Sequence, residues 1–157
     1  MKKTSPIVSG FLLFFPLIIG SVPTLFLEIG DSYRSFEKPP FSPPGIVFPI
    51  VWTLLYLLMG ISSFLIYKKC KEEKLSLLPA LVPFYLQLLL NVFWTFLFFG
   101  LGAYLLGALW IFAMIAVILW MISRFRQIDR IAAVLQIPYL LWCCFAAYLS
   151  LGVYLLN

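Results

Sequence analysis

Five long apolar runs, none of which contains a charged residue, constrain the fold of this chain most. We place them at residues 7–27, 45–67, 77–99, 103–122 and 131–156. Each has about 20 residues or more, the length that an α-helix needs to cross a hydrocarbon core of about 30 Å. Because hydrocarbon offers the backbone no hydrogen-bond partners, each run is expected to be helical. The sequence therefore predicts an all-α integral membrane bundle, a single domain of five transmembrane helices over residues 1–157.

The composition agrees with a membrane protein and excludes several functions. Hydrophobic residues make up 64% of the chain and charged residues 11%, whereas a soluble domain has about 25% charged residues. The net charge of +5 is therefore no sign of a nucleic-acid partner, and we expect none. The chain has no histidine, the commonest metal ligand and general base. We expect no metal site, no required cofactor and no conventional catalytic residues.

The positive charges predict how the chain lies in a cell membrane. In a five-helix arrangement, one side carries Lys2, Lys3, Lys68, Lys69, Lys71, Lys74, Arg124, Arg126 and Arg130, and the other only Arg34 and Lys38. Cytoplasmic loops are enriched in Lys and Arg. We therefore expect a cytoplasmic N-terminus, with the C-terminus and the long polar connection over residues 28–43 outside.

The polar connection ends in a proline-rich segment, KPPFSPP at residues 38–44. Proline fixes φ and has no N–H, so this segment is expected to be stiff and extended. Tyr33, Arg34 and Lys38 lie in or next to it and could cover a pocket and attract carboxylates. The alternative is a solvated loop that contacts lipid headgroups.

Aromatic and amide side chains are spaced to share helix faces. Trp52, Tyr56 and Gly60 are four residues apart and form either a wall for a flat ligand or a packing stripe. The third run has such a stripe at Phe84, Gln87, Asn91, Trp94 and Phe98, and the fifth at Leu135, Pro138 or Tyr139, Trp142, Phe145 and Leu149. The amides should face the bundle, where they either join helices or contact a ligand. Trp94 and Trp142 lie well inside the runs, so each indole N–H needs a partner or a ligand.

Three segments together resemble the tryptophan-rich sensory protein/translocator protein family (TspO/MBR), also called the peripheral-type benzodiazepine receptor family. They are KPPFSPPGIVFPIVWTLLYLLMG at residues 38–60, LNVFWTFLFF at 90–99 and PYLLWCCFAAYL at 138–149. The resemblance, to bacterial members in particular, implies a five-helix bundle that is commonly dimeric. It also implies binding of porphyrins and of isoquinoline and benzodiazepine-type ligands. Bacterial members are linked to tetrapyrrole signalling, efflux and light-dependent porphyrin breakdown.

By this resemblance we expect a protoporphyrin-type tetrapyrrole to lie in a pocket beneath the polar connection. The expected ligand-binding residues are Tyr33, Arg34, Lys38, Pro44, Phe48, Trp52, Tyr56, Gln87, Asn91, Phe93, Trp94, Pro138, Trp142, Phe145 and Ala146. Two hypotheses follow. The protein promotes light-dependent oxidative degradation of the pigment, with Trp52 and Trp142 as photochemically reacting residues, or it is a passive carrier or sensor of porphyrins and other hydrophobic ligands.

The chain departs from the family pattern in three places. Gly45 and Ile46 stand where many members have a tryptophan, and Ser150 stands where many have asparagine. No Lys or Arg follows Arg130, so the sterol motif of animal members is absent, and the sequence leaves sterol binding open. The resemblance also predicts a homodimer through a helix-three or helix-four surface, where Ala103 and Gly107 form a small-residue motif.

Overall fold

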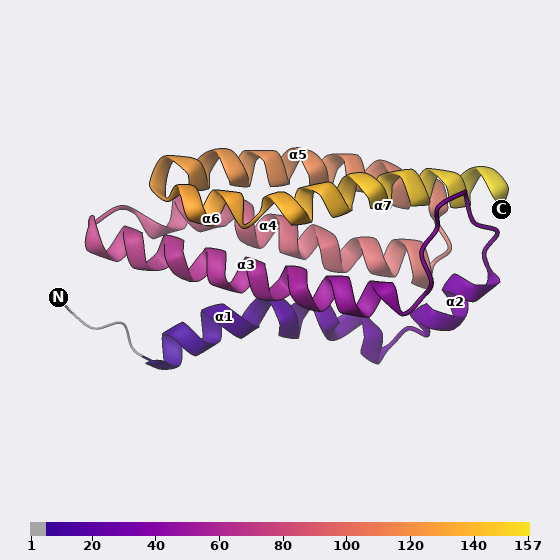
Figure 1. The fold of residues 1–157 in the computed structure, drawn as a ribbon, viewed down its shortest axis with the longest axis horizontal. Coiled ribbons are helices and arrows are strands. Elements are labelled where there is room, and N and C mark those ends of the chain that lie inside the picture. The colour runs from indigo at the N-terminus through magenta and orange to yellow at the C-terminus, as the bar shows by residue number, and fades with distance from the viewer. Residues whose placement is uncertain (1–5) are drawn as a thin grey trace.

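The computed structural model describes residues 6–157 and is a bundle of long helices (Figure 1). Its elements are α1 (Pro6–Ser21), the 3₁₀ turn η1 (Val22–Leu25), α2 (Ile29–Ser35), α3 (Val47–Glu72), α4 (Leu77–Thr95), the π-helical η2 (Phe96–Gly100), α5 (Tyr104–Ile128), α6 (Arg130–Val134) and α7 (Ile137–Leu156). Within the described residues, five helical segments are long and apolar enough to cross a membrane. The predicted all-α membrane bundle with five spans is confirmed.

Two of the helices continue beyond the predicted ends. α3 reaches Glu72 and α5 reaches Ile128, so both extend into charged segments that we expected to be loops. Good helix formers continue each helix there. In α3, Lys68 lies 3.9 Å from Glu72, and Lys69 lies 3.0 Å from Glu73 just past the helix end. These pairs, four residues apart, add some support to a helix end outside the apolar layer.

Prolines interrupt two of the predicted helices. The first changes from α-helix to a 3₁₀ turn after Ser21, where Pro23 has no N–H and its ring would meet the carbonyl four residues earlier. In the last predicted helix, a turn at residues 135–136 separates α6 from α7. Pro138 lies in the first turn of α7, where a missing N–H is tolerated best. The last span therefore changes direction at this turn.

Residues 28–44 are more structured than the sequence indicated. Ile29–Ser35 form the short helix α2, and the proline-rich segment is not continuously extended because it turns at residues 40–41. Phe41 has a positive φ of 65°, a conformation that is uncommon for a residue with a Cβ. Figure 1 shows α2 and this segment at the end of the bundle where the C-terminus lies.

Glycines bring α1 and α3 into close contact. A Cβ atom on Gly60 would collide with the backbone carbonyl of Leu13, and one on Gly20 would collide with the ring of Tyr56. Gly60 does lie on the face of α3 that Tyr56 shares, but α1 fills the space beside it. The glycine thus serves helix packing and not ligand contact.

The small-residue motif on α5 is also used within one chain. Gly107 is buried, and a Cβ atom there would lie 2.9 Å from Cδ2 of Phe98 in η2. Gly107 is therefore not on the outer surface where a second chain could reach it. The homodimer stays a prediction, which the detergent-corrected mass of the purified protein would test.

One amide joins three of the helices in the core. The Tyr56 hydroxyl of α3 donates to Oδ1 of Asn91 in α4 at 2.9 Å, and Nδ2 of Asn91 donates to the Tyr139 hydroxyl of α7 at 3.3 Å. The whole predicted stripe of α4, including Gln87 and Asn91, is buried. Of the two roles that the sequence left open for Asn91, the structure supports the joining of helices.

We expect Asn91→Leu to destabilise the protein, because it leaves the buried Tyr56 and Tyr139 hydroxyls without their amide partner. The free energy of unfolding should fall by about 1–3 kcal/mol for each group that is left unsatisfied. Denaturation in detergent, followed by circular dichroism, measures this change. Adding Tyr56→Phe and Tyr139→Phe to the same chain should restore part of the loss. A single variant as stable as the wild type would contradict this role of Asn91.

Candidate functional site

Two adjoining hollows lie at the end of the bundle that α2 covers. The outer hollow has a volume of about 780 Å³ and is lined by α2, the proline-rich segment and the start of α3. The inner cavity has a volume of about 200 Å³ and lies between α1, α3, α4 and α7. Both are lined by Ile29, Phe48, Pro49 and Phe99. These shared residues show that the inner cavity adjoins the outer hollow.

Aromatic rings form the walls of the inner cavity. Trp52 stacks on Tyr56, with ring centres 5.3 Å apart and planes 26° apart. Trp142 comes from α7 and meets the ring of Phe48 edge-on at 5.8 Å. Trp94 also lines the cavity. Such walls, with few polar groups, suit a flat apolar ligand.

The polar groups around the inner cavity are mostly occupied. Four hydroxyls donate to carbonyls of their own or an adjoining helical turn, namely those of Ser21, Thr24, Thr53 and Thr95. The Tyr56 hydroxyl is bound to Asn91. The indole N–H of Trp94, by contrast, is buried and has no partner among the described residues. A buried donor without an acceptor is costly, so this N–H would be stabilised by an acceptor.

The outer hollow carries the positive charge. Lys38 donates to the Phe36 carbonyl at 2.7 Å, and its Nζ lies 5.0 Å from the centre of the Tyr33 ring. The Tyr33 hydroxyl donates to the Pro43 carbonyl at 2.7 Å. Burial raises the pKa of the Tyr33 phenol, so it keeps its proton at neutral pH and remains a donor.

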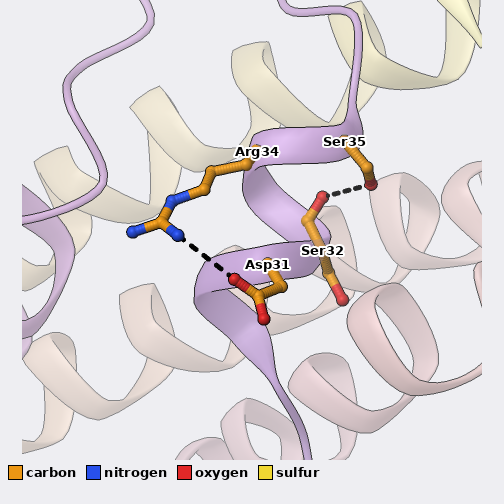
Figure 2. A network of polar contacts seen from close by, with 4 residues as sticks. All are labelled: Asp31, Ser32, Arg34 and Ser35. Carbon is orange, nitrogen blue, oxygen red and sulfur yellow. Dashed lines mark hydrogen bonds and ion pairs between the residues drawn. The ribbon is translucent and has the colours of Figure 1, made fainter.

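Arg34 is the more available of the two cations. Figure 2 shows its guanidinium reaching Asp31, with Nη1 and Oδ1 3.3 Å apart, beside the Ser35 hydroxyl bond to the Ser32 carbonyl. Both partners of the ion pair are exposed, with side-chain exposures of 82% and 70%. An exposed pair contributes at most about 1 kcal/mol. The guanidinium can therefore leave Asp31 for an anionic group in the hollow.

The proline-rich segment is fixed to α7. The Tyr148 hydroxyl donates to the Pro40 carbonyl at 2.7 Å, and the Asn157 side chain exchanges two hydrogen bonds with the backbone of Glu37, at 2.9 and 3.0 Å. A Cβ atom on Gly152 would collide with the Pro39 ring. The wall of the outer hollow is therefore attached to the last helix at several points.

Most of the residues that we expected at the site come together in these hollows. Tyr33, Arg34, Lys38 and Pro44 line the outer hollow, Phe48 lines both, and Trp52, Tyr56, Trp94, Trp142 and Ala146 line the inner cavity. Pro138 and Phe145 instead line a groove on the outside of the bundle, which Trp142 shares.

Three expected residues lie apart from both hollows. Gln87 and Asn91 are fully buried in the core and do not line either hollow. Phe93 is half exposed, with its ring 6.5 Å from Trp110 of α5. Because successive helical residues are about 100° apart, Phe93 cannot share the inward face of Asn91 and Trp94.

By the resemblance, the first helix was expected to help enclose the pocket, but the expected site residues include none from the first run or from the segment that is π-helical in the structure. Leu17, Gly20, Ser21 and Thr24 line the inner cavity, and Phe99 lines both hollows. Leu17, Gly20, Ser21 and Thr24 are spaced i, i+3, i+4 and i+7, as on one helical face. The small and polar residues on this face were the local signal in an otherwise mostly apolar run.

Comparison with known proteins now identifies the family, because the model of the TspO/MBR family matches residues 12–155. The chain belongs to the TspO/MBR family. It is 38% identical to the tryptophan-rich protein TspO of Archaeoglobus fulgidus, over 90% of this chain and 91% of that protein. It is 32% identical to the tryptophan-rich sensory protein of Cereibacter sphaeroides, over 83% and 80%. It is also 36% identical to the translocator protein of Ovis aries, over 75% and 70%.

We expect Gly152→Val to loosen the cover of the site. The added side chain collides with Pro39, so the proline-rich segment has to move off α7. The backbone amide of Glu37, which donates to Oδ1 of Asn157, should exchange its hydrogen faster, as measured by mass spectrometry of the purified protein. Gly10→Val is the matched control, since a Cβ atom there meets nothing within 4 Å. Equal exchange in both variants would show that the segment does not depend on this contact.

Proposed function

We propose that this TspO/MBR protein binds a tetrapyrrole of the protoporphyrin type in the two adjoining hollows. The observation that carries the proposal is an aromatic cavity, lined by Trp52 and Trp142, next to a hollow that carries Arg34 and Lys38. A flat apolar ring fits the aromatic walls, and propionate groups can pair with the two cations. Family membership supports this ligand class through the resemblance described above.

The volumes indicate how such a ligand would lie. Sites for drug-sized ligands have volumes of about 300–1,000 Å³, so the inner cavity of about 200 Å³ is too small by itself. The ligand would have to span both hollows and displace the shared residues Phe48 and Phe99. One edge of the ring would then face Trp52, Trp94 and Trp142, while the carboxylates stay near the outer charges.

We further propose that the chemistry, where light is present, is photochemical. The hollows contain no histidine or carboxylate side chain among their lining residues, so acid–base chemistry lacks its usual groups. A porphyrin brings its own excited state, and the protein then holds indole and ring together. The excited ring would take one electron from an indole of Trp52 or Trp142, dioxygen would add to the reduced ring, and the adduct would return the electron to the oxidised indole, so that both oxygen atoms end on the pigment and the indole is restored.

The second candidate is a passive carrier or sensor. It is favoured by the packing of Trp52 on Tyr56 and of Trp142 on Phe48, since these rings can act as walls alone. Aromatic contact of this kind is worth about 0.5–1.5 kcal/mol beyond burial. Both candidates require binding and differ in the fate of the pigment.

Trp52→Phe and Trp142→Phe separate the two candidates. Phenylalanine keeps an aromatic wall but is much harder to oxidise, so binding of protoporphyrin should largely survive. If the indoles react, the light-driven loss of pigment absorbance should fall sharply in both variants. Trp120→Phe is the control, because Trp120 is 42% exposed on α5 and lines neither hollow. If illuminated wild type binds the pigment and leaves it unchanged, the carrier or sensor role remains.

We propose that the end of the bundle with α2 and the proline-rich segment faces the outside of the cell. Nine Lys and Arg residues are expected on the cytoplasmic side. Seven of them lie within the described residues, near the ends of α3 and α5 and at the start of α6. Lys2 and Lys3 lie outside the described residues. In a chain without its native cysteines, an impermeant maleimide should label Glu37→Cys on intact cells but Lys71→Cys only after permeabilisation. Labelling of Lys71→Cys on intact cells would reverse the orientation.

A further inference from the structure

A third hollow lies on the lipid-facing side of the bundle, between α3 and α7. It is a groove of about 460 Å³, lined by Val51, Leu54, Leu55, Leu58, Pro138, Leu141, Trp142 and Phe145. All eight side chains are apolar, and all belong to segments that can cross a membrane. Leu54 and Leu141 are 57% and 64% exposed. The groove therefore faces hydrocarbon and not water.

The groove lies where the two helices separate. At the cytoplasmic end, by the proposed orientation, α3 holds α6 through a 2.8 Å bond from the Ser62 hydroxyl to the Ala132 carbonyl. The turn at residues 135–136 then changes the direction of the last span. Beyond it, α7 packs mainly on α5, and close approaches between the backbones of α3 and α7 are few. The seam between α3 and α7, where the groove lies, is therefore closed by side chains alone.

Trp142 forms the partition between the groove and the inner cavity. It lines both of them, and its ring is held by contacts with Phe48 at 5.8 Å and Phe145 at 5.6 Å. Adjacent residues of α3 line different spaces. Val51 and Leu55 line the groove, and Trp52 and Tyr56 line the inner cavity. Rotation of one indole would join the two spaces without breaking a backbone hydrogen bond.

We infer that the seam between α3 and α7 is a lateral entrance from the membrane to the inner cavity, with Trp142 as its gate. The inference rests on the proposed function, because it requires a ligand in that cavity. Flat apolar molecules partition into hydrocarbon, so they reach the groove without passing through water. The alternative route leads through the outer hollow, one wall of which is tied to α7 through Pro39, Pro40 and Glu37.

The test compares ligand exchange in variants that fill the groove. Leu54→Trp and Leu141→Trp add bulk to exposed positions of the groove without changing the cavity. Full-length protein in lipid vesicles is mixed with vesicles that contain protoporphyrin, and the absorbance shift of the pigment is followed in time. Leu109→Trp is the matched control, since Leu109 is 56% exposed on α5 and lines none of the three hollows.

The expected result is a slower exchange at unchanged affinity. Association and dissociation rates should both fall about tenfold in the two groove variants, which equals about 1.4 kcal/mol on the barrier, while Leu109→Trp exchanges like the wild type. Trp142→Ala should speed both association and release, with the loss of the gate, whereas loss of a cavity wall alone would speed release only. Unchanged rates in Leu54→Trp and Leu141→Trp, or equal slowing in Leu109→Trp, would overturn the lateral entrance alone. A wild-type protein that does not bind protoporphyrin would overturn the proposed function and the entrance with it.

Discussion

The structure depends on the satisfaction of polar groups inside an apolar environment. Lipid tails offer no hydrogen-bond partners, so a polar side chain within the spans is stabilised when it finds one in the protein. Asn91 does this for three helices at once, through the Tyr56 and Tyr139 hydroxyls. Since Tyr56 also lines the inner cavity, the same hydrogen bonds that join α3, α4 and α7 hold the cavity floor in place.

Prolines and glycines decide where this bundle is tight and where it is open. Gly20 and Gly60 allow α1 and α3 to touch, and Gly20 also lines the inner cavity. Pro23 ends the regular part of α1, and Pro138 accompanies the turn between α6 and α7. Both irregular segments lie next to a hollow or a groove, because a helix that changes direction cannot keep continuous contact with its neighbour.

Arg34, the more available cation of the outer hollow, is exposed to solvent, whereas Trp94 in the wall of the inner cavity is buried. The proposed site depends on this difference. Arg34 and Asp31 are exposed and can exchange partners at little cost. Trp94, in contrast, has a buried N–H without a partner, which gains from any acceptor that a ligand supplies. A ligand with anionic groups at one edge and an apolar ring at the other matches both environments.

The sequence by itself determined the five spans and the inward stripe of α4, because long uncharged runs and helical periodicity depend on local composition. It also led to Trp52, Tyr56, Trp94 and Trp142 through their spacing and their family resemblance. Only the tertiary structure decided that Asn91 joins helices and that Gly107 packs inside one chain. These outcomes depend on which neighbour each helix face meets, and neither composition nor periodicity contains that information.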